Sequence, residues 1–274
     1  MKAKKILFIT QEMLPYVPKS EQADMGRKIP QAIQEKGREI RTFMPKWGNI
    51  NERRNQLHEV IRLSGMNLII DDTDHPLIIK VASIQAAHMQ VYFIDNDDYF
   101  MKRMMATDEN GKEYEDNGER AIFYARGVLE TVKKLRWTPD VIHCQGWMSA
   151  LVPLYIKTAY CDEPSFRDSK VVYSMPAEGL TGSMGENFGN CIAFGDVDSS
   201  VLEGFSAECT FEELNKLAVN YSDGITLPAG DQYQAIAEYA KSKQVPVLEN
   251  ISGEDADALT DFFDRIWSIG KEED

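Results

Sequence analysis

The chain has 274 residues, of which 43% are hydrophobic and 27% charged, so it can form one large domain or two small ones around a substantial core. Its formal net charge of −14 at pH 7 disfavours nucleic acid and anionic membranes as partners, and an anionic substrate would need a local patch of positive charge. The apolar runs are too short for a signal peptide or a membrane-spanning helix, so we expect a cytoplasmic protein. The four cysteines lack the spacing of a disulfide framework or a zinc site and are expected to be reduced, mostly buried thiols.

Seven short apolar segments predict strands, and five amphipathic segments between them predict helices. Most of the strand segments are continuous apolar runs, as in a sheet that is covered on both faces. In chain order the expected elements are strand Lys5–Thr10, helix Gln22–Lys36, strand Glu39–Pro45, strand Val91–Asp95, helix Asn117–Arg136, strand Val141–Cys144, helix Trp147–Thr158, strand Lys170–Met175, strand Gly224–Pro228, helix Asp231–Lys243, strand Val245–Asn250 and helix Asp255–Trp267. This alternation predicts a doubly wound, mostly parallel, Rossmann-like α/β sheet.

Three places in this pattern are less regular. The expected helix Gln22–Lys36 ends before Gly37, a good C-terminal cap position, but Pro30 lies inside it and could instead mark a helix start. Residues 49–87 contain the apolar stretches LIIDD and PLIIKVASI and are expected to form a β excursion. Residues 176–211 contain glycines at irregular spacing, which predicts a mobile loop.

In an open α/β sheet, ligands bind at the carboxyl ends of the strands. This rule nominates four loops: Gln11–Asp24, Asp95–Phe100, Gln145–Trp147 and the loop that begins at Pro176. The first loop has no glycine that would let backbone N–H groups approach a phosphate closely. Its Lys19 could still supply a point charge, or could be a solvated side chain in a polar loop.

Two of these loops carry side chains whose role the residues alone leave open. Asp95 and Asp97 follow an apolar strand as Asp-x-Asp, which in one class of sugar-nucleotide transferases holds a divalent ion against a diphosphate. In a chain with 44 acidic residues, such a triplet also arises easily by chance. His143 ends an expected strand, where a histidine is more often a hydrogen-bonded core residue than a base. The other three histidines have no partner at metal-ligand spacing.

Six segments, in order, resemble the N-terminal catalytic domain of bacterial glycogen synthases and plant starch synthases. They are KILFITQEMLPYV, IRTFMPKWGNI, VYFIDNDDYF, DENGKEYEDNGERAIFYAR, TPDVIHCQGWMSALVPLYIKT and YSDGITLP. The resemblance covers most of the chain from Lys5 to about Ile236. It implies a GT-B architecture, in which two Rossmann-like domains face a cleft, and the transfer of glucose from ADP-glucose to an α-1,4-glucan. It implies neither a cofactor nor a metal.

The resemblance assigns roles to residues in two further segments. In EDNGER, Asp116, Asn117 and Arg120 match the family, whose Asp lies at the sugar end of the cleft. This implies that Asp116 is catalytic and that Asn117 and Arg120 bind substrate. The family's first loop, Lys-Thr-Gly-Gly-Leu-Ala-Asp, has its Lys and glycines near the nucleotide phosphates. Here the loop is PKSEQAD, in which Asp24 matches and Lys19 is offset by one position, and both are expected to bind substrate.

The family's signature at the end of the central strand is His-x-His-Asp-Trp, and this chain has HCQGW. His143 and Trp147 match and are expected to bind substrate. Gln145 replaces the His that lies near the transferred sugar, and we expect it to orient the donor by hydrogen bonding as a catalytic residue. Gly146 replaces the Asp.

These assignments support two functions. In the first, residues 1–274 form a single N-terminal-type domain of a glycogen/starch synthase-like glucosyltransferase, with ADP-glucose and an α-glucan as ligands. The second, C-terminal nucleotide-binding domain is not expected within these residues and would come from a separate chain. In the alternative, the protein is a catalytically inactive relative that binds a glucan or another protein, with a regulatory or scaffolding role.

Overall fold

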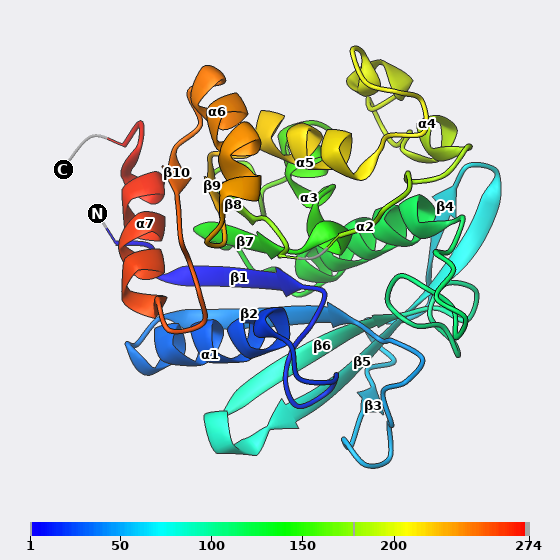
Figure 1. Ribbon diagram of the computed structural model, residues 1–274. Coiled ribbons are helices and arrows are strands. Elements are labelled where there is room, and N and C mark those ends of the chain that lie inside the picture. The colour runs from blue at the N-terminus through cyan, green and yellow to red at the C-terminus, as the bar shows by residue number, and fades with distance from the viewer. Residues whose placement is uncertain (1, 178, 272–274) are drawn as a thin grey trace.

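The computed structural model describes residues 2–177 and 179–271, which form one sheet with helices on both of its faces (Figure 1). The first half of the chain contains β1 (Lys5–Thr10), α1 (Glu21–Glu35), β2 (Glu39–Pro45), β3 (His58–Glu59), β4 (Met66–Ile70), β5 (Thr73–Ile84), the 3-10 helix η1 (Gln85–Ala87), β6 (Met89–Asp95) and α2 (Asn117–Lys134). The second half contains β7 (Val141–Gln145), η2 (Trp147–Ser149), α3 (Val152–Lys157), β8 (Lys170–Ser174), α4 (Phe188–Cys191), η3 (Ser199–Leu202), α5 (Phe211–Asn220), β9 (Gly224–Thr226), η4 (Asp231–Tyr233), α6 (Gln234–Ser242), β10 (Val247–Leu248) and α7 (Ala256–Ser268).

The strands follow the order β10-β9-β8-β7-β1-β2-β6-β5-β3 across the sheet, and β4 pairs with β5 beside this path. Neighbours from β10 to β6 pair in parallel, whereas β5 is antiparallel to β6, β3 and β4. The chain winds outward from β1 in one direction through β2 and in the other through β7. The doubly wound, mostly parallel sheet expected from the sequence is therefore confirmed, and its switch point lies between β1 and β7.

Different helices cover the two faces, because side chains alternate along each strand. Ile6 and Phe8 of β1 belong to a cluster that α1 and α7 complete with residues such as Ile29 and Phe263. Leu7 and Ile9 of β1 point to the opposite face and belong to the main core, together with residues of α2, α3, α5 and α6. Neither face of β1 is left to solvent, which explains why its sequence is a continuous apolar run.

Each strand and helix expected from the sequence is present, with shifted ends in several cases. Helix α1 runs through Pro30, so the alternative that Pro30 begins a helix is wrong. The expected β excursion is the antiparallel set β3–β5. The expected loop at 176–211 contains the short helices α4 and η3, and α5 after it was not expected.

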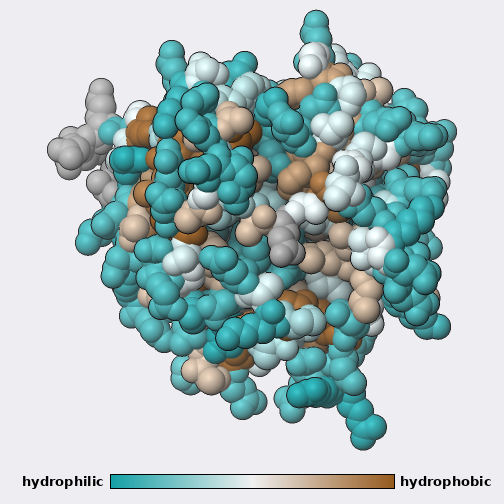
Figure 2. Space-filling model, viewed as in Figure 1, coloured by the Kyte–Doolittle hydropathy of each residue, from teal (hydrophilic) through white to brown (hydrophobic). Residues whose placement is uncertain are grey.

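The described part of the chain also shows how apolar the helices are and in what state the cysteines lie. None of the described helices is long and apolar enough to cross a membrane. The face seen in Figure 2 is mostly hydrophilic, with hydrophobic side chains interspersed toward its hollowed centre. All four cysteines are free, and three of them are buried.

Candidate functional site

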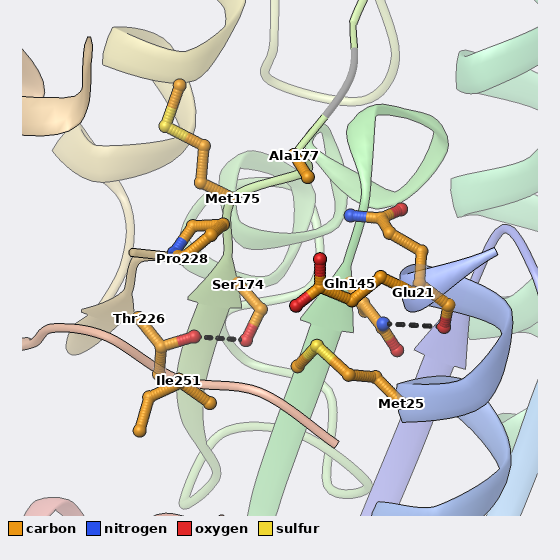
Figure 3. Close-up of a pocket in the computed structure, with 10 residues that line it drawn as sticks. Glu21, Met25, Gln145, Ser174, Met175, Ala177, Thr226, Pro228 and Ile251 are labelled. Atoms are coloured by element: carbon orange, nitrogen blue, oxygen red, sulfur yellow. Dashed lines mark hydrogen bonds between the residues drawn. The ribbon is translucent and has the colours of Figure 1, made fainter. Parts of the chain in front are cut away.

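A row of four polar side chains lies at the carboxyl ends of the central strands. Thr10 of β1, Gln145 of β7, Ser174 of β8 and Thr226 of β9 are consecutive partners in the strand register. Because they share one register position, their side chains project toward the same face, the one covered by α1 and α7. Ser174 Oγ lies 2.5 Å from Thr226 Oγ1, and Gln145 Nε2 donates to the Gln22 carbonyl of α1 over 3.1 Å (Figure 3). This face of the sheet therefore ends in hydrogen-bonding groups.

A cleft of about 520 Å³ lies at the same edge of the sheet. The end of β1 and the first turn of α1 form one side of its lining, and the loop at 104–107 forms another. Its polar side chains include the amides of Gln11, Gln22 and Asn49. A smaller cavity, drawn in Figure 3, has Glu21, Gln22 and Ala177 in common with the cleft and extends to Gln145 and Ser174. The cleft and the row of polar side chains at the strand ends thus form one candidate site.

A buried hydrogen-bond network forms the side of the cleft next to β1. Gln11 Nε2 lies 3.2 Å from both Glu12 Oε1 and Gln22 Oε1 and donates to them. Ser20 Oγ donates to Glu12 Oε2 over 2.5 Å, and Glu12 is only 9% exposed. Trp47 Nε1 donates to the Gln11 carbonyl over 2.8 Å. The network fixes a carboxylate and two amides beside the cleft.

Helix α1 reaches the cleft because Gly26 lets it pack closely on the end of β1. A Cβ at this position would lie 2.1 Å from the Glu12 carbonyl oxygen, so a larger residue would push the helix away. The helix begins at a side-chain cap, in which Ser20 Oγ accepts from the Ala23 N–H over 2.9 Å. These two features fix Glu21 and Gln22, in the first turn of α1, at the cleft.

Helix α2 holds the loop at 104–107 through two side chains in its first turn. Arg120 donates to three backbone carbonyl oxygens at 2.6–2.9 Å, those of Tyr99, Met104 and Met105. Arg120 also donates to Asn117 Oδ1 over 2.8 Å, and Asn117 Nδ2 donates to the Ala106 carbonyl over 3.0 Å. This wall of the cleft therefore takes its shape from backbone bonds to Arg120 and Asn117.

Arg120 is fully buried among aromatic rings. Its guanidinium carbon lies 4.8 Å from the Tyr114 ring centre, 5.3 Å from that of Trp47 and 5.7 Å from that of Phe100. Burial, together with the nearby charge of Arg103, lowers the pKa of Arg120 to about 9, so it stays protonated at neutral pH. Neither Arg120 nor Asn117 lines the cleft, and their direct binding of substrate, which the resemblance implies, stays a prediction.

Asp116, expected to be catalytic, lies just before α2 and is paired with Arg103. Arg103 Nη1 donates to Asp116 Oδ2 over 2.7 Å, and the Arg103 guanidinium stacks 4.3 Å from the Tyr114 ring centre. The Asp116 carboxylate does not line the cleft or the smaller cavity. A ligand group that reached Asp116 would compete with Arg103, and the catalytic role of Asp116 stays a prediction.

The two polar residues at the end of β7, His143 and Gln145, lie in different surroundings. His143 is 2% exposed, lies between the rings of Phe8 and Phe263, and has its Nε2 2.5 Å from Ser174 Oγ. Burial lowers the pKa of His143 to about 3, so the ring is neutral at pH 7. His143 is thus the hydrogen-bonded core residue of the two alternatives that the sequence left open. Gln145, two residues further, lines the smaller cavity.

Gly146 and Trp147 form the turn that follows β7. Gly146 has φ +87°, in the left-handed region, and a Cβ there would lie 2.4 Å from Gln11 Oε1. The Gln11 side chain therefore occupies the space where the family's Asp would begin. Trp147 lines the cleft, as expected of a substrate-binding residue, but it is only 2% exposed.

The two expected residues of the first loop lie in different surroundings. Lys19 is exposed and lines the cleft, whereas Asp24 is paired with Lys28 on the surface of α1 at 2.7 Å and does not line it. Among the described residues that line the cleft or the smaller cavity, Lys19 is the one basic side chain, and Glu12 and Glu21 are acidic. The lining therefore carries more negative than positive charge.

The Asp-x-Asp segment does not form a metal site in the part of the chain described. Asp95 is 5% exposed, and its Oδ2 lies 2.8 Å from Lys80 Nζ while its Oδ1 accepts from the Asn96 N–H. Asp97 is exposed. No group of three or more His, Cys, Asp or Glu side chains within residues 2–177 and 179–271 could hold a metal ion. The ion pair with Lys80 accounts for Asp95 without a metal.

Sequence reasoning did not single out Gln11, Glu12, Trp47 or Glu113. Gln11 and Glu12 follow the end of β1, and Trp47 follows the end of β2. The rule that ligands bind at strand ends was therefore the one signal for these three residues. Glu113 Oε1 accepts from the Thr181 N–H over 2.7 Å, and its Oε2 accepts from the Gly182 N–H over 2.9 Å. These bonds join two loops that are far apart in the sequence, and no local pattern could have indicated them.

Fold and cleft define a Rossmann-type α/β domain with a candidate ligand site at the carboxyl edge of its sheet. The family model of the starch synthase catalytic domain matches residues 5–229, and the chain belongs to this family. The glycogen synthase of Pelodictyon phaeoclathratiforme is 40% identical over 172 residues, which cover 62% of this chain and 35% of that protein. The glycogen synthase of Chlorobaculum parvum is 32% identical over 241 residues, which cover 87% of this chain and 48% of that protein.

A solved structure has the same fold. It is the catalytic domain of starch synthase IV from Arabidopsis thaliana bound to ADP and acarbose, with a TM-score of 0.71 and 15% identity, and the match covers 92% of this chain and 52% of that one. The chain spans less than half the length of the curated relatives it matches. The family expected from the sequence is confirmed, as is the Rossmann-like fold similar to the N-terminal half of a two-domain GT-B glycosyltransferase.

Proposed function

We propose that this protein is a glycogen/starch synthase-like component of α-glucan synthesis and that its cleft binds sugar units of an α-1,4-glucan. The observation that carries the proposal is the lining of the cleft in a member of this family, with the uncharged amides of Gln11, Gln22 and Asn49. Amides both donate and accept hydrogen bonds, as sugar hydroxyl groups do. Val17, Met104 and Ala106 add apolar surface to the lining, and Trp47 and Trp147 lie behind it almost fully buried.

By the resemblance, Asp116 would contact the sugar, Gln145 would orient the donor, and Lys19 would contact the phosphates in glucosyl transfer from ADP-glucose. The charge of the lining argues against the last of these three roles. A departing diphosphate needs positive charge close to its oxygens. Lys19 is the one basic side chain among the described residues of the lining, and Glu21 lies beside it. We therefore propose that a separate chain with a second nucleotide-binding domain holds the phosphates.

Two observations favour the alternative of a catalytically inactive relative. The lining has two carboxylates, Glu12 and Glu21, against the single ammonium group of Lys19. In addition, the carboxylate of Asp116 already accepts a hydrogen bond from Arg103. A protein that only binds a glucan needs neither a phosphate site nor a free acidic group.

Calorimetry with maltoheptaose, followed by a transfer assay with labelled ADP-glucose, tests the proposal. We expect maltoheptaose to bind the wild-type protein and Gln22→Ala to weaken this binding about fivefold, which corresponds to about 1 kcal/mol for a lost hydrogen-bonding group. Gln34→Ala, near the other end of α1, is the matched control and should leave the affinity unchanged. Failure of the wild-type protein to bind maltoheptaose or glycogen at millimolar sugar would contradict the proposal.

The transfer assay separates the two functions. Incorporation of glucose by the chain together with a partner that has a nucleotide-binding domain, and its loss in Asp116→Ala, supports the enzyme. Glucan binding that is never accompanied by transfer supports the inactive relative. Transfer that Asp116→Ala leaves unchanged removes Asp116 from the mechanism.

A further inference from the structure

The carboxylate of Glu12, a residue that precedes α1, lies next to the N-terminus of this helix. A helix N-terminus attracts anions, because its first N–H groups have no partner within the helix and its dipole is positive there. Here Ser20 Oγ accepts from the Ala23 N–H, and the Ser20 hydroxyl in turn donates to Glu12 Oε2 over 2.5 Å. Gln11 Nε2 donates to the other oxygen, Glu12 Oε1, over 3.2 Å. The Glu12 carboxylate is thus held next to the start of α1 by two donors.

This carboxylate is part of the cleft and is not free to leave it. Glu12 is 9% exposed and lines the cleft, and its backbone is fixed by the close approach of Gly26. The next acidic group, Glu21, is the first residue of α1 and lines both the cleft and the smaller cavity (Figure 3). A diphosphate at the start of α1 would meet both carboxylates, and only Lys19 among the described lining residues would oppose them.

We propose that Glu12, held by Ser20 and Gln11, takes the place of an anionic ligand at the N-terminus of α1 and, with Glu21, makes the cleft reject nucleotide diphosphates. The site is thereby left to an uncharged saccharide, and Glu12 and Glu21 together determine this specificity. The inference rests on the proposed function, because it assigns the sugar but not the nucleotide to this cleft. Like charges in a partly buried site repel strongly, since water screens them poorly.

The test measures the dissociation constants of ADP and of maltoheptaose for the wild-type chain, Glu12→Gln, Glu21→Gln and the double variant. Both substitutions keep the shape of the side chain and remove its charge. We expect the double variant to bind ADP about tenfold more tightly than wild type and the exposed Glu21→Gln alone about threefold more tightly. Maltoheptaose binding is measured on the same variants and should persist in each of them, because an amide still bonds to hydroxyl groups. Glu35→Gln, at the exposed far end of α1, is the matched charge control and should change neither constant.

The ADP measurements decide this inference, and the maltoheptaose measurements decide the proposed function. If wild type binds ADP as tightly as Glu21→Gln and the double variant, Glu12 and Glu21 do not exclude diphosphates and the inference is wrong. If Glu12→Gln does not fold, the threefold gain in Glu21→Gln over Glu35→Gln still decides it. A wild-type chain that fails to bind maltoheptaose overturns the proposed function, whatever the result with ADP.

Discussion

Replacement of Arg120 by Met should destabilise the protein strongly, because it removes the side chain that anchors the wall of the cleft. Arg120 makes four hydrogen bonds, at 2.6–2.9 Å, and all of their acceptors belong to the protein. A buried acceptor that loses its partner costs about 1–3 kcal/mol. The loop can relax toward water in the cleft and recover part of this loss, so we expect Arg120→Met to lower the free energy of unfolding by about 3–5 kcal/mol.

Urea unfolding followed by tryptophan fluorescence measures this loss. Arg120→Lys should lie between Met and wild type, because lysine keeps the charge but lacks the planar fork that reaches several carbonyl groups at once. Arg62→Met is the matched control at an exposed position and should change stability by less than about 0.5 kcal/mol. Maltoheptaose affinity is then measured on the folded fraction of each variant.

One result would refute this reasoning. If Arg120→Met lowered the free energy of unfolding by less than about 1 kcal/mol and yet abolished maltoheptaose binding, Arg120 would act on the ligand and not on the loop. That outcome would support the direct substrate contact which the family resemblance implies. If Arg120→Met and Asn117→Ala both lowered the free energy of unfolding by comparable amounts, the anchoring role of both residues would be supported.

Three further predictions concern other parts of the site. The pKa of His143 is about 3 in the folded protein and about 6.5 in the unfolded chain, so only the unfolded chain gains a proton between these pH values. The free energy of unfolding should therefore fall as the pH drops below 6.5. In urea unfolding, wild type should lose about 2 kcal/mol more than His143→Gln between pH 6.5 and pH 5. Gly146→Ala should cost about 1–3 kcal/mol in thermal unfolding, since Gly146 has positive φ and faces Gln11, and Gln11→Ala should relieve part of this loss; full additivity of the two changes would contradict the clash. Glu113→Ala should speed limited proteolysis near Thr181 several-fold, and equal cleavage rates would show that Glu113 does not join the two loops.

The central fold could be predicted from the sequence because local patterns there agree with tertiary packing. Strand β1 is apolar at successive positions and is buried on both faces, so its expected and observed ends coincide. Helix α1 was less certain because of Pro30, yet an interior proline removes only one hydrogen bond, and the apolar face of the helix is held by the sheet and α7.

The missed helix α5 had a readable signal. Thr210 and Glu213 form a capping box, in which the Thr210 side chain accepts from the Glu213 N–H and the Glu213 side chain accepts from the Thr210 N–H. This pattern at the end of a glycine-rich segment predicts a helix start. The partners of β5, by contrast, could not be read, because antiparallel pairing depends on contacts between strands that no local pattern specifies.

For the site, the sequence indicated which loops meet but not which atoms face the cleft. The ends of β1 and β7 were expected to meet there, and the cleft lies beside them. Arg120 and Asn117 are three residues apart and share a helix face, but only the folded loop reveals that this face points to backbone carbonyl groups. Glu12 carries no recognisable motif, since its role depends on Ser20, eight residues later in the chain.

The anchoring of the loop at 104–107 has a consequence for how this cleft can diversify. Arg120 bonds to the carbonyl oxygens of Tyr99, Met104 and Met105, and every amino acid supplies such an oxygen. The path of the loop therefore depends less on its side chains, and those at Met104 and Thr107, which do not belong to the hydrophobic core, can be exchanged while the wall keeps its shape. A library of variants randomised at these positions, built on an unchanged Arg120, would sample new ligand contacts on a constant frame.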